Sequence, residues 1–146
     1  MKMINNKLKI LFLINTPTSY QDDFFSELKK YVSVSVIFYS SDYKNYNFKI
    51  KNNNKYYYFL DKSKKSSKFI IDITKKINPD FTIIGGYRLP YISKLQTFLN
   101  LNEKKYFFWL ERLNNKKKLK NTIISFLIKY RIKKSNGVLA VGIEAK

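Results

Sequence analysis

The sequence predicts an α/β fold, a Rossmann-like doubly wound parallel sheet of about six strands with helices on both faces. Short apolar runs alternate with longer amphipathic segments along the 146 residues, as expected when a crossover helix follows each strand. The first run, Leu8–Ile14, is almost continuously apolar, which is typical of a strand covered on both faces. A chain of this length can bury one core, so we expect a single domain over residues 1–146.

The predicted strands are short and rich in β-branched and aromatic residues. After the first, they are Val32–Ser40, Lys55–Leu60, Phe81–Ile84, Tyr106–Leu110 and Gly137–Gly142. Residues 42–54, between the second and third strands, are polar and rich in asparagine and lysine. We expect them to form a loop.

The predicted helices are marked by their periodicity and their end signals. They cover Gln21–Tyr31, Ser63–Asn78, Pro90–Asn102 and Lys116–Lys134, and Ile143–Lys146 looks like the opening of another. The first helix has acids in its first turn and lysines in its last, the polarity that the helix dipole favours. Pro79 ends the second helix, and Pro90 opens the third at a position where proline is tolerated.

The composition excludes several classes of active site. The chain has no cysteine, which rules out disulfides and cysteine-ligated metals. It has no histidine either, so the usual general base and the commonest metal ligand are absent. A zinc site or a Ser-His-Asp triad is therefore excluded.

The net charge of +19 is almost entirely due to lysine, because only Arg88, Arg112 and Arg131 are arginines. Lysine lacks the planar fork that arginine uses on guanine or phosphate. Its abundance together with Asn, Ile, Tyr and Phe is also what AT-rich codons supply. We therefore favour a solvated basic surface over a nucleic-acid-binding one, with a surface attracted to anionic lipid as an intermediate hypothesis.

The sequence shows no targeting or spanning segment. Ile10–Ile14 is too short for a secretory core and leads into a turn. No stretch approaches the roughly 20 apolar residues of a transmembrane helix. We expect a cytoplasmic protein that could lie peripherally on the inner face of the membrane.

A site is expected where the strand order reverses. In a doubly wound sheet the first strand is central and the fourth returns to its other side, so a crevice opens at the carboxyl ends of both. Those ends are Asn15–Tyr20 and Gly85–Pro90, and Trp109–Leu113 at the tip of the fifth strand would lie beside them.

The usual nucleotide and phosphoacceptor motifs are missing from this position. A dinucleotide site needs G-x-G-x-x-G after the first strand, whereas Asn15–Tyr20 has no glycine. A Walker loop is absent, and a receiver domain would need an acidic pair where Asn15 and Thr16 stand. These absences disfavour all three classes.

Two segments of the expected crevice, Gly85–Arg88 and Glu111, each allow a ligand-binding role or a purely structural one. Gly85-Gly86 could be a phosphate cradle or a tight turn, and Arg88 could pair with an anionic ligand or remain a solvated charge. Glu111 closes an apolar strand. Its carboxylate could contact a ligand or form an ion pair with Arg112 or a lysine.

The order of several segments resembles the N-terminal domain of GT-B-fold glycosyltransferases of the family 4 group. These segments are TPTSYQDDFFSELKK, VSVSVIFYS, INPDFTIIGGYRLP, YFFWLER, the basic helix and NGVLAVGIEAK. Family members similarly place Pro-Asp before strand four, a glycine-containing loop after it, and a Trp-x-Glu-like segment at strand five. Each motif is weak alone; their order and spacing carry the resemblance, which covers nearly the whole chain.

The resemblance implies a transfer of sugar from a nucleotide-sugar co-substrate to an acceptor, a glycan or lipid-linked molecule in cell-envelope polysaccharide synthesis. It implies no bound metal and no cofactor. In such enzymes this domain receives the acceptor, and a C-terminal domain binds the donor. We expect that second domain to be absent from this chain, which is then a fragment or a split subunit that is inactive alone. A non-catalytic α/β binding or regulatory subunit is the alternative.

The resemblance also assigns site residues by position. Glu111 is the expected catalytic residue. The expected substrate-binding residues are Thr16, Pro17, Thr18, Ser19, Tyr20, Gly85, Gly86, Tyr87 and Arg88. Two departures from the family are the lack of a glycine-rich loop at Thr16–Ser19 and the presence of Glu111 where many members have histidine.

The basic helix Lys116–Lys134 has two possible roles under this interpretation. Its predicted apolar face consists of Leu119, Ile123, Phe126, Leu127 and Tyr130. This face either packs on the sheet, leaving the lysines solvated, or docks on an anionic membrane near a lipid-linked acceptor.

Overall fold

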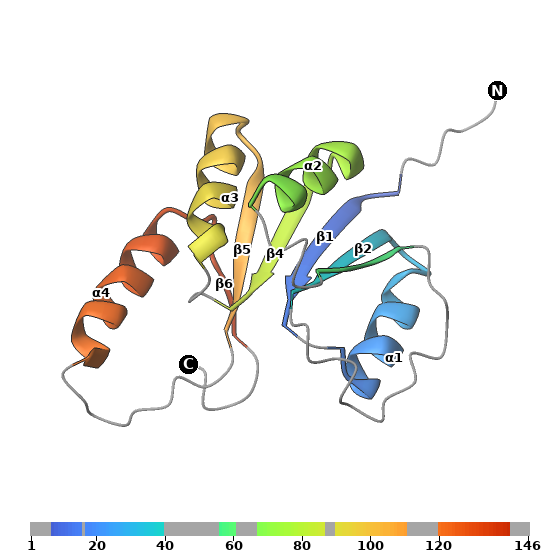
Figure 1. Ribbon diagram of the computed structural model, residues 1–146. Coiled ribbons are helices and arrows are strands. Elements are labelled where there is room, and N and C mark those ends of the chain that lie inside the picture. Colours follow the sequence, from blue (N-terminus) through green and yellow to red (C-terminus); the bar gives the residue numbers. More distant parts are fainter. Residues whose placement is uncertain are drawn as a thin grey trace.

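A computed structural model describes residues 7–15, 17–39, 56–60, 67–86, 90–110 and 120–140. The elements alternate as predicted (Figure 1). They are β1 Lys9–Ile14, α1 Ser19–Leu28, β2 Ser33–Phe38, β3 Tyr57–Phe59, α2 Ser67–Ile77, β4 Phe81–Gly85, α3 Pro90–Leu101, β5 Lys105–Leu110, α4 Lys120–Lys133 and β6 Val138–Ala140.

The strands form one six-stranded parallel sheet in the order β3-β2-β1-β4-β5-β6. The predicted Rossmann-like, doubly wound fold is therefore confirmed. Phe12 of β1 stands opposite Val36 of β2 on one side and Ile83 of β4 on the other. The direction of winding reverses between β1 and β4, which is where ligands bind in open α/β sheets.

Helices cover both faces of the sheet, with α1 on one face and α2, α3 and α4 on the other (Figure 1). On the first face, Phe25 of α1 is buried in one cluster with Phe12 and Val36. On the second face, Ile70 of α2 and Leu95 of α3 are buried with the odd-numbered leucines of β1, Leu11 and Leu13. Burying each such side chain contributes about 1.5–3 kcal/mol, so β1 is fixed by apolar contacts on both sides.

The ends of α2 and α3 are set by residues in the left-handed region. Asn78 follows α2 with φ 47° and Glu103 follows α3 with φ 52°. The Asn78 N–H donates to the carbonyl oxygen of Thr74 at 2.9 Å. Such a residue stops a helix and turns the chain, so that β4 and β5 begin at the same edge of the sheet.

The orientation of α4 differs from the predicted one in which its apolar face packs on the sheet. Phe126 and Tyr130 of the predicted apolar face are 69% and 52% exposed, whereas Ile128 is buried and Ile132 packs against the core. Residues two positions apart point to nearly opposite sides of a helix, so packing Ile128 inward turns Phe126 outward. The expectation that this face packs on the sheet is wrong for Phe126 and Tyr130.

Polar contacts fix α4 in this orientation. The Arg131 guanidinium donates to Ser93 Oγ at 2.6 Å, and the Arg131 carbonyl oxygen accepts from Gln96 Nε2 at 3.2 Å. Leu119 lies outside the described residues, and the side chains of Ile123 and Leu127 are likewise not described. Within the described part of the chain, no helix combines the length and apolar character needed to cross a bilayer.

Candidate functional site: the crevice between β1 and β4

The topology brings three segments of the predicted crevice together at one edge. Residues 17–20 follow β1 and lead into α1, Gly85 ends β4 and Gly86 comes directly after it. Trp109 of β5 stands opposite Gly85 in the ladder. The predicted neighbourhood of strands one, four and five is therefore confirmed.

Close packing accounts for both glycines. A Cβ at Gly85 would lie 3.0 Å from Ile14 Cγ2, tighter than ordinary carbon contacts. Gly86 has φ +98°, which side-chain-bearing residues rarely adopt. A Cβ there would also collide with the Tyr39 hydroxyl. The pair thus lets the ends of β1, β2 and β4 approach one another, as the tight-turn interpretation requires.

Tyr39 also belongs to this edge, although no sequence pattern singled it out. It follows β2, its N–H donates to the Ile14 carbonyl oxygen at 3.0 Å, and its hydroxyl donates to the Gly85 carbonyl oxygen at 2.7 Å. Its side chain is almost fully buried. The sequence feature that could have indicated this role is the position of Tyr39 at the end of β2, the strand that borders the central strand β1.

The start of α1 presents polar groups at the crevice. Thr18 is the N-cap residue, with φ −130° and ψ 158°, yet its side chain makes no capping hydrogen bond. Its Oγ1 is buried and has no hydrogen-bond partner among the described residues. Pro17 is buried, whereas Ser19 and Tyr20 are exposed. An uncapped first turn leaves backbone N–H groups available to a ligand.

Trp109 contributes an aromatic wall on the α1 side of the sheet. Its ring packs edge-on against Phe12 and Phe24, with centroids 6.0 Å and 5.9 Å away. Phe24 lies one turn after Tyr20 and Gln21 on α1, which brings the Trp109 ring close to the start of that helix. Gly85, its ladder neighbour, has no side chain to cover the ring.

Three buried polar atoms lie on the elements that form this wall and have no hydrogen-bond partner in the described part of the chain. They are Thr18 Oγ1, Gln21 Oε1 and Trp109 Nε1. An unpaired buried donor or acceptor costs about 1–3 kcal/mol. The set offers both donors and acceptors, so buried water could satisfy these atoms in place. The hydroxyl groups of a bound molecule could do the same once a side-chain rearrangement exposes the atoms, which have almost no accessible surface.

Two further buried atoms of this kind lie away from the crevice. Thr82 Oγ1 is inside β4, and Lys29 Nζ is at the far end of α1. Burial lowers the pKa of Lys29, and the charge of Asp22 offsets part of that effect. The ammonium lies over the rings of Tyr56 and Tyr57, 5.1 Å and 4.9 Å from their centroids.

Asp22 links that lysine to the first turn of α1. The carboxylate is buried and accepts a 2.7 Å hydrogen bond from the Tyr57 hydroxyl. It therefore faces β3, and we assign it a structural role. Among the residues that the structure describes, no group of three or more acids could hold a metal ion.

Four predicted site residues lie outside the described residues: Thr16, Tyr87, Arg88 and Glu111. The roles of Arg88 and Glu111 therefore stay predictions. The described half of the crevice consists of the α1 start, the glycine pair and Trp109.

Comparisons with known proteins give a fold and no family. No protein-family model and no curated protein matches the sequence. Among solved structures, a UDP-N-acetylglucosamine 2-epimerase matches with a TM-score of 0.60 at 13% identity over 95% of this chain and 43% of its own. A protein of Listeria monocytogenes assigned to the same activity matches with a TM-score of 0.60 at 8% identity over 95% of this chain and 40% of its own.

These matches show a Rossmann-like domain of the GT-B-like fold, which those epimerases share with glycosyltransferases. The identities are too low to carry more than the fold. The chain spans less than half the length of either matching chain.

Proposed function

We propose that this chain is the acceptor-binding half of a glycosyltransferase that moves a sugar from a nucleotide-sugar to a glycan or lipid-linked acceptor. The observation that carries the proposal is the meeting of the carboxyl ends of β1, β4 and β5. There Thr18, Gln21 and Trp109 carry buried polar atoms that have no hydrogen-bond partner among the described residues, beside the aromatic wall of Trp109. A sugar presents hydroxyl groups around an apolar ring face. It can therefore satisfy buried polar atoms and contact an indole ring at the same time.

The proposal gives each segment a role. Residues 16–20 and the glycine pair form the floor and one wall, and the start of α1 offers backbone N–H groups to acceptor oxygens. Arg88 pairs with an anionic group of the ligand. Glu111 contacts the reacting hydroxyl of the acceptor or the donor sugar, because a carboxylate can accept a hydrogen bond from a hydroxyl group that is about to react.

The donor site lies, under this proposal, on a C-terminal domain or a partner chain. The likeness to two nucleotide-sugar enzymes of the GT-B-like fold, each more than twice as long as the matched region, supports a second half of this kind. The chain alone should therefore carry no transferase activity.

The same likeness favours a second candidate, one half of a nucleotide-sugar epimerase. The two candidates differ in product. A transferase forms a glycosidic bond to an acceptor, whereas an epimerase inverts one carbon of the sugar and needs no acceptor.

The test is to assay the chain alone and together with a donor-binding domain, encoded downstream or as a separate subunit, using UDP-N-acetylglucosamine and other nucleotide-sugars. We expect acceptor-dependent release of nucleotide only in the mixture. Turnover by the chain alone contradicts the division into halves. Formation of an epimer without acceptor supports the epimerase instead.

A further inference from the structure

The edge of the sheet opposite the crevice carries a concentration of lysines. Because the strands are parallel, the helices that connect them run back and end where the strands begin. The exposed or half-buried lysines at this edge are Lys7, Lys9, Lys30, Lys75, Lys76, Lys104, Lys105, Lys133 and Lys134. We call this set the lysine edge.

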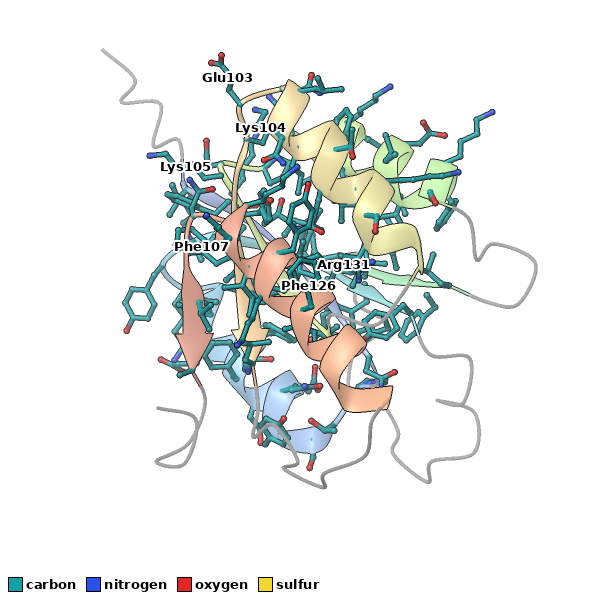
Figure 2. The ribbon with its side chains drawn as sticks, turned by 90° about the vertical axis from the view of Figure 1, so that its left-hand side faces the viewer. Glu103, Lys104, Lys105, Phe107, Phe126 and Arg131 are labelled. Atoms are coloured by element: carbon teal, nitrogen blue, oxygen red, sulfur yellow. The ribbon has the colours of Figure 1, made fainter. Side chains whose placement is uncertain are left out.

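Contacts between elements place several of these lysines at one edge. Lys7 Nζ donates to the Lys30 carbonyl oxygen at 3.0 Å, which ties the start of β1 to the end of α1. Lys104 Nζ donates to Asn78 Oδ1 at 2.8 Å, which ties the start of β5 to the turn between α2 and β4. Glu103, Lys104 and Lys105 lie together at the upper edge in Figure 2, where β5 begins.

Few negative groups balance the lysine edge. Its described carboxylates are Glu27, Asp80 and Glu103. Glu27 pairs with Lys30 at 2.6 Å, and Asp80 Oδ2 accepts from the backbone N–H of Lys9 at 2.8 Å. Each of the four helix C-termini adds about half a negative charge. The lysine edge keeps an excess of positive charge after the carboxylates and the helix C-termini are both counted.

Exposed apolar side chains stand among these lysines. Leu101 ends α3 and is 79% exposed, Tyr31 follows Lys30 and is 70% exposed, and Leu8, between Lys7 and Lys9, is 40% exposed. Leucine and tyrosine partition into the interfacial region of a bilayer, beside basic residues that contact anionic headgroups.

We propose that the lysine edge is a docking surface for an anionic lipid bilayer. The edge is dominated by lysine, and the one arginine in the last turn of α4, Arg131, donates a hydrogen bond to Ser93 Oγ at 2.6 Å. This favours lipid over nucleic acid, since arginine is the residue suited to bidentate recognition of bases and phosphates. Exposed leucines also gain nothing from a sugar-phosphate backbone in water. Charge complementarity and insertion of apolar side chains both fit a lipid surface.

Docking of this kind differs from the predicted docking through α4. The six residues of β1 separate the lysine edge from the crevice, a length of about 20 Å. The docked chain presents its crevice toward the aqueous phase. If the crevice binds a sugar acceptor, as proposed above, the reacting hydroxyl stands well clear of the lipid headgroups; the docking itself does not depend on that function.

The experiment measures flotation of the 146-residue chain with vesicles of phosphatidylcholine alone and with phosphatidylglycerol in about equal amount. We expect binding only to the anionic vesicles. Lys76→Glu/Lys105→Glu should weaken it at least about tenfold. The matched control, Lys68→Glu/Lys94→Glu, makes the same charge change on exposed residues in the early turns of α2 and α3 and should bind as the wild type does.

Two outcomes would overturn the proposal, and a third would overturn its apolar part. Equal losses in both double variants would show that net charge alone drives binding. Unchanged binding of Leu101→Asn would remove the apolar contribution. Retention on DNA that depends on Lys76 and Lys105, without vesicle binding, would assign the edge to nucleic acid. Circular dichroism checks folding, and Lys76→Gln/Lys105→Gln gives the same comparison if the charge reversal unfolds the chain.

Discussion

The hydroxyl of Tyr39 donates a 2.7 Å hydrogen bond to the carbonyl oxygen of Gly85, so the chain after β2 reaches past β1 to the end of β4. The same hydroxyl occupies the space that a side chain at Gly86 would need. Tyr39 and the glycine pair therefore form one packing unit at the floor of the crevice.

The first prediction tests that unit. Tyr39→Phe removes the hydrogen bond and should lower the free energy of unfolding by about 0.5–1.5 kcal/mol. Gly86→Ala should cost more, because alanine must adopt φ +98° and its Cβ meets the hydroxyl. In the Tyr39→Phe background the collision is gone, so Gly86→Ala should be less costly there. Urea unfolding of the four proteins measures this coupling; additive costs would show that the residues act independently.

The second prediction concerns pH. Burial lowers the pKa of Lys29 below 10.5, its value in the unfolded chain, so the unfolded state binds more protons in the interval between the two values. The charged side chain therefore costs stability at neutral pH, and that cost fades as the pH rises to 10.5. Lys29→Met keeps the apolar stem without the charge. The melting temperature of the wild type minus that of Lys29→Met should rise with pH. A difference that stays flat or falls with pH would contradict the prediction.

The third prediction concerns the orientation of α4. Ile128→Ala should lower the free energy of unfolding by about 2–4 kcal/mol, because it leaves a cavity in the space that the buried isoleucine side chain fills. Phe126→Ala removes a larger but exposed side chain and should change it by less than about 0.5 kcal/mol. Chemical denaturation of both variants compares them directly. The reverse ranking would mean that the Phe126 face is the packed one.

The fourth prediction concerns Glu111. In the chain joined to its donor-binding half, Glu111→Gln should lower kcat/KM at least about tenfold, because the carboxylate is proposed to contact the reacting groups. Glu103→Gln is the control, since Glu103 lies at the opposite edge of the sheet. Unchanged kinetics in the Glu111 variant would remove that residue from the mechanism.

Much of the fold could be predicted from the sequence because it depends on local patterns. Alternating apolar runs and helices indicate parallel strands, and right-handed crossovers then leave few possible strand orders. Pro90 correctly marked the start of α3. The first helix begins at Ser19 rather than Gln21 because Thr18 occupies the N-cap position, which its apolar periodicity does not reveal.

The remaining features depend on side chains that meet across the fold. The role of Tyr39 arises from its reach past the neighbouring strand, a contact that no local pattern encodes. The sequence of α4 offers two apolar faces of similar hydrophobicity. One face carries Phe126 and Tyr130, and the other carries Ile128 and Ile132. Only packing against α3 and the sheet decides between them.

The central claim, that the crevice binds a sugar, can be tested on this chain through its single tryptophan, Trp109. Titration with oligosaccharides should give a saturable change in tryptophan emission. Thr18→Val should weaken the response by about fivefold, through loss of one hydrogen bond. Thr97→Val on α3, whose hydroxyl bonds to the Ser93 carbonyl oxygen, should leave it unchanged. Emission unaffected by any sugar, or a response that ignores Thr18, would contradict the account.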